Sequence, residues 1–279
     1  MRGVESAEAL PAWPGDEQPA VSRIVSLAPS NTEIAYYLGL GPQVVGVCDD
    51  SQWPSDARTK AKVGMDLQID AAKVAALHPD LVLASLSVPG MEKCVAAVRE
   101  RGLDAIVLDP KSLENVFDNI EEVARAAGVP HRGLSLARQM REGFAHVERA
   151  VAGLDRPTVF WEWWPRPLIS PGAKSWMVDL VRIAGGSMLF KEEDRDSFAV
   201  EEERLLSADP EVIILCWIGA IAKKQDPAKV YAREGWAGVK AVRGRRVFAL
   251  PDTLFAAPGP RVVEGARALA KVLHPQVSL

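Results

Sequence analysis

The chain contains an internal repeat, in which a segment of the first half recurs in the second half. Residues 73–83 (KVAALHPDLVL) correspond to residues 204–214 (RLLSADPEVII). Each copy is typical of the end of a helix, a turn that contains proline and a short buried strand, because proline ends a helix and the apolar run is short and branched. A chain with this repeat is expected to contain the same strand-and-helix unit twice.

Other pairs of segments extend the repeat. Residues 102–109 resemble residues 244–251, and in both a glycine precedes a strand. The strands expected at residues 23–27 and 158–162 each lead into a helix, and these helices end near Gly39 and Gly185. Each half therefore alternates strand and helix, which predicts an α/β fold of two similar lobes with mainly parallel sheets.

The segment between the halves predicts one long helix over residues 131–154, opened by Pro130 and closed by Gly153. Its apolar residues recur every three or four positions, which is the spacing of one buried helix face: Leu136, Met140, Phe144, Val147, Val151 and Leu154. The predicted organisation is a mobile N-terminal tail (1–20), an N-terminal lobe (21–130), this linking helix and a C-terminal lobe (155–279).

Composition and charge exclude several classes of protein. The formal net charge is −4, whereas a nucleic-acid-binding protein needs a basic surface. The longest apolar run, residues 212–222, is shorter than the roughly 20 residues of a membrane-spanning helix. The first twenty residues lack the basic start and apolar stretch of a secretory signal, so none is predicted. The three cysteines are expected to be buried thiols.

Signatures of catalysis are not found in the sequence. No Gly-x-Ser-x-Gly elbow occurs, and the partial glycine pattern at residues 39–46 follows a helix and contains proline, unlike a phosphate-binding loop. The histidines have no spacing that would form a zinc site with each other or with cysteine: His78, His131, His146 and His274. The sequence therefore predicts neither a catalytic residue nor a metal site.

Tryptophan is concentrated in the segment WEWWPRP at residues 161–167. Alternation along a strand buries Trp161 and Trp163 on one face and places Glu162 and Trp164 on the other. Core packing explains one tryptophan well, but an aromatic loop beyond a strand also suits a large, partly aromatic ligand. Trp163 and Trp164 are thus candidate ligand contacts. The neighbouring Arg166 is either a partner for a carboxylate or phosphate or a solvated surface residue.

In the first half, acidic residues follow two expected strands. Asp50 and Trp53 follow the strand at residues 44–47, and Asp66 follows residues 62–63. They are either solvated loop residues or one wall of a ligand site at the carboxyl ends of the strands. The motif SNTE at residues 30–33 has the spacing of a helix capping box, and the start of that helix is a further candidate for the ligand site.

Several motifs together resemble a known family. The segment RIVSLAPSNTEI at residues 23–34, the turn LHPDLV at residues 77–82 and the closing PRV at residues 260–262 occur in the family's order, as does the spacing from Pro171-Gly172 to Gly185-Gly186. Across residues 21–275 the chain resembles the solute-binding proteins of ABC importers for cobalamin and iron siderophores, the helical-backbone metal receptors. The resemblance implies two α/β lobes bridged by a rigid helix, a ligand held in the cleft between them and no chemistry on the ligand.

The resemblance also implies site residues. Trp163 matches one of the aromatic residues that clamp the corrin ring in the family's cobalamin binder, and the other clamp positions are occupied by Asp50, Asp66, Ser85 and Ser197. Phe198 and Thr253 complete the expected ligand-binding set. Family members dock on their permease through one exposed glutamate per lobe. The second-lobe position is Glu203, and the first-lobe position is Ala72.

These observations predict a non-enzymatic, monomeric binding protein for a cobalamin-type corrinoid or a ferric siderophore. It would be the substrate-binding component of an ABC importer, with the permease as its partner and no nucleic acid or catalytic cofactor. The resemblance implies an extracytoplasmic location, periplasmic or at the cell surface, and because no signal peptide is predicted, the cytoplasm is the alternative. Two alternatives are a soluble intracellular chelate carrier without a transport role and a chelatase-type enzyme, which would need a cleft base such as histidine.

Overall fold

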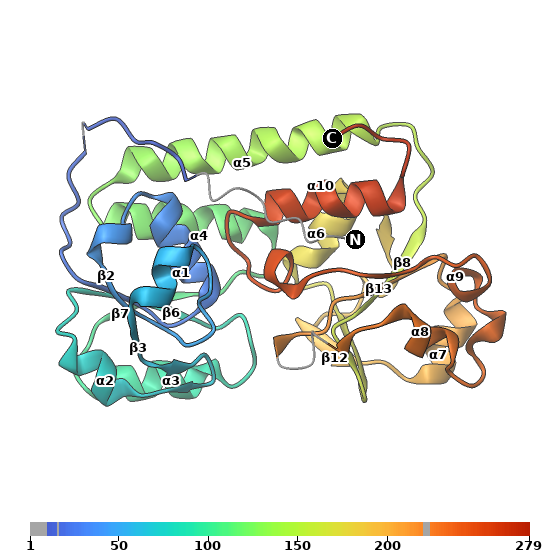
Figure 1. Ribbon diagram of the computed structural model, residues 1–279, viewed down its shortest axis with the longest axis horizontal. Helices are drawn as coiled ribbons and strands as arrows, with labels where there is room; N and C mark the ends of the chain where they lie inside the picture. Colours follow the sequence, from blue (N-terminus) through green and yellow to red (C-terminus); the bar gives the residue numbers. More distant parts are fainter. Residues whose placement is uncertain (1–9, 16, 220–223) are drawn as a thin grey trace. The chain divides into compact units, whose positions relative to one another are not determined.

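The computed structural model describes residues 10–15, 17–219 and 224–279, and these form two compact units. The N-terminal unit comprises Met1–Pro110 and Glu114–Gln139, and the C-terminal unit comprises Lys111–Leu113 and Met140–Leu279. Each unit contains its own parallel sheet flanked by helices (Figure 1), which confirms the predicted α/β fold class.

The N-terminal unit is built on a five-stranded parallel sheet with the strand order β3-β2-β1-β6-β7. Its strands are β1 (Ile24–Ser26), β2 (Val44–Val47), β3 (Ala61–Lys62), β6 (Leu81–Ser85) and β7 (Ala105–Leu108). A small antiparallel hairpin, β4 (Gly64–Met65) and β5 (Gln68–Ile69), follows β3 directly.

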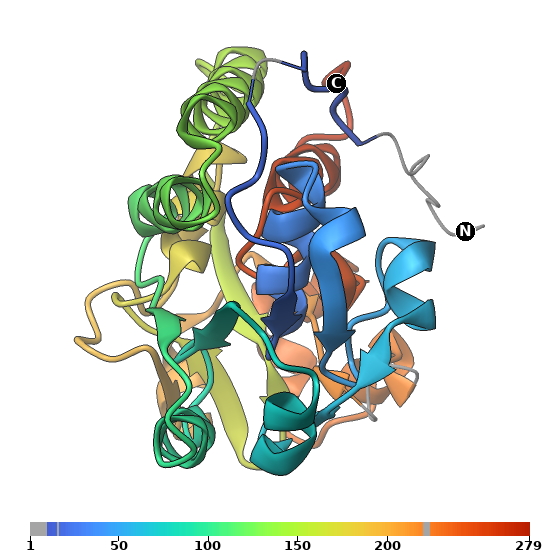
Figure 2. The ribbon, with the colours of Figure 1, turned by 90° about the vertical axis from the view of Figure 1, so that its left-hand side faces the viewer.

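Helices cover both faces of this sheet. Figures 1 and 2 show its strands between α2 and α3 on one side and α1 and α4 on the other. The bounds are α1 (Pro29–Tyr37), α2 (Ala71–Ala76), α3 (Met91–Arg99) and α4 (Leu113–Ala126). Val25 and Val82 pack with Val74 and Val98 on the first side, because alternate strand residues point to the same face.

The C-terminal unit has a four-stranded parallel sheet with the order β11-β8-β13-β14. Its strands are β8 (Thr158–Glu162), β11 (Ser187–Met188), β13 (Val212–Leu215) and β14 (Val247–Ala249). A second, antiparallel sheet is formed by β9 (Trp164–Pro165), β10 (Leu168–Pro171) and β12 (Ser197–Ala199). Strand β8 therefore runs straight from the parallel sheet into the first strand of the antiparallel one.

Helices also cover both faces of the C-terminal parallel sheet. Figure 1 shows α6 and α10 on one side and α7 and α8 on the other. The bounds are α6 (Trp176–Ile183), α7 (Glu202–Ala208), α8 (Pro227–Tyr231), α9 (Lys240–Arg243) and α10 (Val262–Leu273). On the α7 side, Phe160 and Ile213 pack with Leu205, Val230 and Trp236 in one buried cluster.

The repeat predicted from the sequence is present in both units. In each, a short helix (α2 or α7) leads through a proline turn into a central strand (β6 or β13) that pairs with the first strand of its unit. His78 and Asp209, which precede the two prolines, have nearly the same left-handed backbone conformation, with φ of 46° and 47°. The correspondence therefore extends to backbone geometry.

The predicted long helix exists as α5 (Pro130–Ala150), and the boundary between the two units falls within it, between Gln139 and Met140. It ends four residues before the expected end. Leu154 N–H donates to the Val151 carbonyl in a tight turn, and Gly153 has a φ of 78°, which is incompatible with a helix. The C-terminal lobe was expected from residue 155, but the C-terminal unit already includes the second half of α5.

The predicted N-terminal tail is residues 1–20, of which residues 1–9 and 16 lie outside the described residues. The described residues of this segment, 10–15 and 17–20, make specific contacts with the N-terminal unit and with α5. The Trp13 indole donates to the Tyr37 carbonyl at 2.8 Å, and the Glu17 carboxylate accepts from the N–H groups of His131 and Arg132 at 2.9 and 3.2 Å. Glu17 thereby satisfies free N–H groups at the start of α5, where a negative charge is favourable.

The expected capping box at residues 30–33 is wrong. Helix α1 begins at Pro29, its cap residue is Ala28, and no side chain caps it. Proline suits the first helical position because its fixed φ matches the helix and it needs no hydrogen bond there. The side chains of Ser30 and Thr32 are buried instead: the Thr32 hydroxyl contacts Ser26 and Ser51, and the Ser30 hydroxyl donates to the Asn31 side chain.

The three cysteines are free and buried, as predicted: Cys48, Cys94 and Cys216. Burial raises the pKa of Cys48 to about 11, so its thiol stays protonated at neutral pH. Across the described residues, no helix is both long and apolar enough to cross a membrane.

Candidate functional site

Loops at the carboxyl ends of parallel strands are where α/β sheets bind ligands. In the N-terminal unit these are residues 48–53 after β2, the β4–β5 hairpin after β3 and residues 86–90 after β6. Three of the predicted site residues (Asp50, Trp53 and Asp66) lie in them, and Ser85 is the last residue of β6. We call these three segments the N-terminal ligand loops.

A buried network of hydroxyl groups supports the N-terminal ligand loops. The Thr32 hydroxyl on α1 lies 2.8 Å from the hydroxyls of both Ser26 and Ser51, and Ser51 lies 3.1 Å from the Cys48 thiol. The Asn31 amide donates to the Ala84 carbonyl at 2.9 Å. These contacts join the start of α1 to the ends of three strands, so the polar residues that resembled a capping box act as internal braces.

The structure brings Asp50 and Asp66 close to each other. Burial raises the pKa of the Asp66 carboxyl above its ordinary value, and the nearby Asp50 charge raises it further. Asp50 is exposed. Ser85, by contrast, is buried, and its hydroxyl donates to the Ser87 hydroxyl at 2.9 Å. Asp50 and Asp66 therefore form the acidic part of the N-terminal ligand loops, whereas Ser85 shapes a turn.

The hairpin that carries Asp66 is tied to the turn after β2. Asp49 N–H donates to the Gly64 carbonyl at 2.8 Å, and Gly64 N–H donates to the Asp49 carboxylate at 3.1 Å. Gly64 has a φ of 112°, and a Cβ there would lie 2.3 Å from the Gln68 carbonyl oxygen. Only glycine fits this position without moving the backbone.

The variant Gly64→Ala is therefore expected to destabilise the protein by about 3 kcal/mol, the sum of an unfavourable backbone conformation and a clash with backbone. Gly102→Ala is the matched control: its φ is 71°, but nothing lies within 4 Å of an added Cβ, so about 1 kcal/mol is expected. Urea unfolding measures both, and amide exchange at Asp70, whose N–H donates to Val63, follows the hairpin itself. Equal losses for the two variants would contradict this reading of the hairpin.

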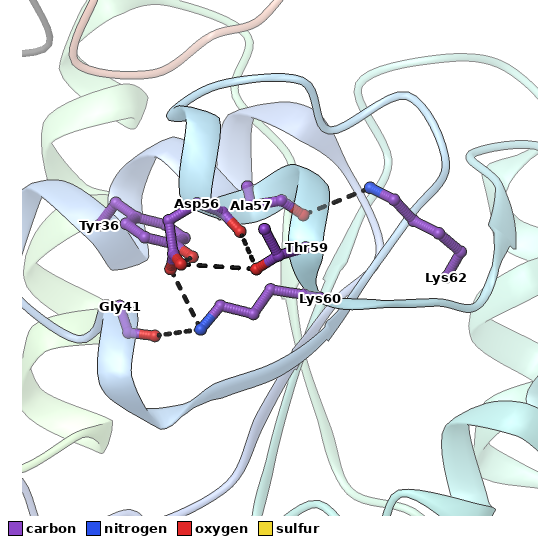
Figure 3. A network of polar contacts seen from close by, with 7 residues as sticks. All are labelled: Tyr36, Gly41, Asp56, Ala57, Thr59, Lys60 and Lys62. Atoms are coloured by element: carbon purple, nitrogen blue, oxygen red, sulfur yellow. Dashed lines mark hydrogen bonds and ion pairs between the residues drawn. The ribbon is translucent and has the colours of Figure 1, made fainter.

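Trp53 stacks on Tyr37 at the end of α1, with ring centroids 5.2 Å apart and planes at 25°. The residues after it, Ser55–Thr59, form a short 3-10 helix held by the polar network of Figure 3. The Tyr36 hydroxyl donates to Asp56 at 2.5 Å, and the Lys60 ammonium contacts the same carboxylate at 3.1 Å. The network anchors the loop that carries Trp53 to helix α1.

This network predicts a pH-dependent contribution to stability. The hydrogen bond from Tyr36 lowers the pKa of Asp56 below 3.8, and the contact with Lys60 lowers it further, against a smaller opposing effect of burial. The contribution is fully present above pH 3.8 and is lost as the pH falls through the lowered native pKa. Asp56→Asn should cost less than about 1 kcal/mol at pH 6, because Asp56 is exposed to solvent, and progressively less below pH 4. Urea unfolding at several pH values measures it, and a loss independent of pH would contradict it.

In the C-terminal unit, the tryptophan segment occupies the end of β8 and the strand β9. Trp161 and Trp163 share one side, as predicted, with ring centroids 5.7 Å apart in an edge-to-face contact, and both are buried. Trp164 is half-buried and donates its indole N–H to the Arg166 carbonyl at 3.0 Å. Arg166 is exposed. Trp164 and Arg166 are therefore more accessible to a ligand than Trp163.

Glu162, between the tryptophans, is fully buried rather than on an open face. Arg233 donates to its two oxygens at 2.6 and 2.7 Å, and the Trp217 indole donates at 2.9 Å. The carboxylate is thus fully paired, as a charge in the interior must be. Arg233 also lies over the Trp236 ring, 4.5 Å from its centroid. The contacts of Glu162, at the end of β8, therefore reach two segments: the one after β13, which carries Trp217, and the one after α8, which carries Arg233.

The other predicted residues of the C-terminal unit lie on different elements. Phe198 is in β12 and contacts Phe190 edge to face at 5.7 Å, so part of its ring belongs to the core. Thr253 is exposed in the short helix after β14, and Glu203 is exposed in the first turn of α7. In the N-terminal unit, Ala72 is exposed in the first turn of α2.

A cavity of about 880 Å³ lies beside the β9–β10 turn of the C-terminal unit. Of the predicted ligand-binding residues only Arg166 lines it, with Trp217, Lys229, Arg233, Glu201 and Glu202 among the others. Its cations and carboxylates are mixed, so the cavity shows no preference for one sign of charge. No group of three or more His, Cys, Asp or Glu side chains suited to a metal occurs in the part of the chain that the structure describes.

Sequence reasoning missed several side chains at the carboxyl ends of strands. Trp217 and Ile218 follow β13, and they were part of the apolar run at residues 212–222, which was considered only as a possible membrane span. Met65 and Leu67 flank Asp66 on the hairpin, where both are exposed. Met65 ends the two-residue strand β4, and Asp66 and Leu67 form the turn before β5. Such a short segment has no periodic pattern, so only the structure distinguishes it from a core segment.

The geometry can be compared with known proteins. The sequence profile of the periplasmic binding protein family matches residues 24–254. The chain belongs to this family. The match covers both parallel sheets and the whole of α5, so the family assignment applies to the complete two-unit fold.

Individual relatives of this periplasmic binding protein cover nearly the whole chain. The uncharacterized ABC transporter substrate-binding lipoprotein YvrC of Bacillus subtilis (strain 168) is 29% identical over 91% of this chain and 80% of the relative. The crystal structure of the periplasmic vitamin B12 binding protein BtuF of Vibrio cholerae is similar with a TM-score of 0.76, at 26% identity over 91% of this chain and 96% of that one. The periplasmic heme-binding protein BhuT, solved with two hemes, has a TM-score of 0.75 at 25% identity, over 90% and 98% of the two chains.

Proposed function

We propose that this periplasmic binding protein is the substrate-binding component of an ABC importer and that it binds a metal chelate: a cobalamin-type corrinoid, a heme or a ferric siderophore. The observation that carries the proposal is the similarity to a vitamin B12 binding protein over 91% of the chain. The similarity to a heme-binding protein extends the range of chelates. A periplasmic location is proposed on the same basis.

Side chains of both units support this function. In the C-terminal unit, Trp164 and Arg166 offer an accessible aromatic ring and a cation beyond β8. In the N-terminal unit, Trp53, Asp50 and Asp66 lie in the N-terminal ligand loops. Flat rings with a few polar groups suit a large planar chelate, whose faces are apolar and whose edges are polar. The proposed role is binding and delivery, with no reaction on the chelate.

The test is direct binding of purified protein to cobalamin, hemin and a ferric siderophore. A bound chelate should quench tryptophan fluorescence with a stoichiometry of one per chain. At a ligand concentration of about 100 Kd it should stabilise the folded state by about 2.7 kcal/mol, which raises the melting temperature.

Trp164→Phe should reduce the quenching, whereas Trp13→Phe is the control, because Trp13 lies outside the ligand loops and its indole donates to a backbone carbonyl, that of Tyr37. If none of the three chelate classes gives quenching or a thermal shift, the proposed function is wrong.

A further inference from the structure

Large apolar side chains that are exposed to solvent are few in this protein, and two share one hairpin. Among the described residues, Met65 is 52% exposed and Leu67 is 45% exposed, and the others are Leu134 and Ile218. A single exposed apolar side chain is common on a protein surface and needs no explanation. Two neighbouring ones at the edge of a sheet where α/β proteins bind ligands indicate a contact surface. Met65 and Leu67 belong to the hairpin that follows the carboxyl end of β3.

The hairpin holds these two side chains outward in a fixed backbone. Its base is tied to the turn after β2 by the pair of Asp49–Gly64 hydrogen bonds and to itself by the bond from Asp70 N–H to Val63. Its tip is tied to α3, since the Cys94 thiol donates to the Asp66 carbonyl at 3.6 Å. An apolar surface that is both exposed and braced is ready to contact a ligand without reordering the loop.

The charged residues within the loops around this apolar pair are all acidic. The N-terminal ligand loops (48–53, 64–69 and 86–90) contain Asp49, Asp50 and Asp66 and no lysine, arginine or histidine. Two neighbouring cations are already hydrogen-bonded to backbone carbonyls of the first loop: Arg58 donates to Gln52 at 2.8 Å and Lys62 donates to Ser51 at 3.3 Å. Lys62 also donates to the Ala57 carbonyl at 3.4 Å (Figure 3). The raised pKa of Asp66, caused by burial and then by the nearby Asp50 charge, agrees with a crowded acidic surface.

Ionised carboxylates accept hydrogen bonds and cannot donate them. They therefore favour a ligand edge that carries N–H donors and repel one that carries carboxylates. We infer that the N-terminal unit selects a chelate whose edge bears alkyl groups and primary amides, with Met65 and Leu67 contacting the alkyl groups and Asp50 and Asp66 accepting from the amides. This rests on the proposed function and narrows its ligand class. Arg166 in the C-terminal unit would favour the opposite charge, so the selection depends on the two aspartates.

The experiment compares two corrinoids that share the ring and differ only at its edge: dicyanocobinamide, whose side chains are primary amides, and dicyanocobyrinic acid, in which they are free carboxylates. Hemin, with its two propionates, is the third probe. Titration at pH 7.5 should give at least tenfold tighter binding for the amide-bearing corrinoid than for either carboxylate-bearing probe. The difference should shrink as salt is added, because it arises from charge.

Two sets of variants separate the contributions. Asp50→Asn with Asp66→Asn should reduce the preference for the amide-bearing corrinoid at least fivefold, and Asp104→Asn, an exposed acid before β7, should leave it unchanged. Met65→Ser with Leu67→Ser should weaken both corrinoids by a similar factor of five or more, and Leu134→Ser is its exposed control on α5.

The outcomes distinguish this inference from the proposed function. If dicyanocobyrinic acid or hemin binds as tightly as dicyanocobinamide, or if the aspartate variants keep the preference, the inference is overturned while the proposed function stands. If none of these probes, cobalamin or a ferric siderophore binds, the proposed function is overturned and this inference with it.

Discussion

Replacing Arg233 with alanine is expected to lower the melting temperature by about 10 °C. Arg233 supplies two of the three hydrogen bonds to Glu162, a carboxylate with 0% exposure. Removing one member of a buried ion pair costs about 3–5 kcal/mol, because a charge remains in the interior without its partner. In a domain of this size each kcal/mol corresponds to a shift of about 2–4 °C.

A matched variant tests whether burial causes the loss. Lys174 and Asp194 form an ion pair of similar length, 3.0 Å, but their side chains are 50% and 83% exposed. Lys174→Ala should cost less than about 1 kcal/mol. The double variant Arg233→Met with Glu162→Gln should recover much of the stability, since the Trp217 indole can still donate to the amide oxygen. A loss for Arg233→Ala no larger than for Lys174→Ala would contradict the buried pair.

The alternation of strands and helices in each half could be predicted because it depends on local signals that occur twice. Proline turns after short helices, followed by branched apolar runs, appear at residues 78–85 and 209–215, and both runs became central strands. The periodic apolar face of α5 was equally visible. Its end was not, because Val151 continues the apolar pattern while Gly153 changes the backbone. Periodicity predicts which face is buried better than where the helix stops.

The candidate site could be predicted only where it coincides with strand ends. Asp50, Asp66 and the tryptophan segment follow strands, so the rule for parallel sheets found them. The partners of Glu162 could not be predicted in this way, since Arg233 lies 71 residues away and no sequence spacing connects the two residues. Alternation placed Glu162 on the face opposite Trp161, and because helices cover both faces of a parallel sheet, both sides of β8 are buried. A buried charge is found from the partner that packs against it, and that requires the structure.

The second large effect is expected in transport, where Glu203→Ala should reduce uptake of the chelate at least about tenfold. Glu203 is exposed in the first turn of α7, between Glu202, which accepts from the Trp236 indole, and Arg204, which pairs with Glu193. Its neighbours therefore hold the helix start in place, and Glu203 itself is available to a partner. A carboxylate that becomes desolvated against a permease arginine contributes several kcal/mol, more than an exposed pair of about 1 kcal/mol.

The control for this prediction is Glu201→Ala, since Glu201 precedes α7, is exposed and makes no capping hydrogen bond. Uptake is measured in proteoliposomes that contain the permease and ATPase, and chelate affinity is measured separately by fluorescence. Glu203→Ala should change the affinity less than about twofold, because Glu203 lies outside the ligand loops, whereas Glu201→Ala should leave both quantities near their wild-type values.

The reverse substitution tests the other unit. Ala72 is exposed in the first turn of α2, the position in the N-terminal repeat that corresponds to Glu203 in α7. A glutamate there would be stabilised by the helix N-terminus and would restore a second carboxylate, so Ala72→Glu should strengthen permease binding by about fivefold or more. If neither Glu203→Ala nor Ala72→Glu alters uptake or permease affinity, the docking assignment is wrong, and a chelate carrier without a permease becomes the better account of the same binding protein.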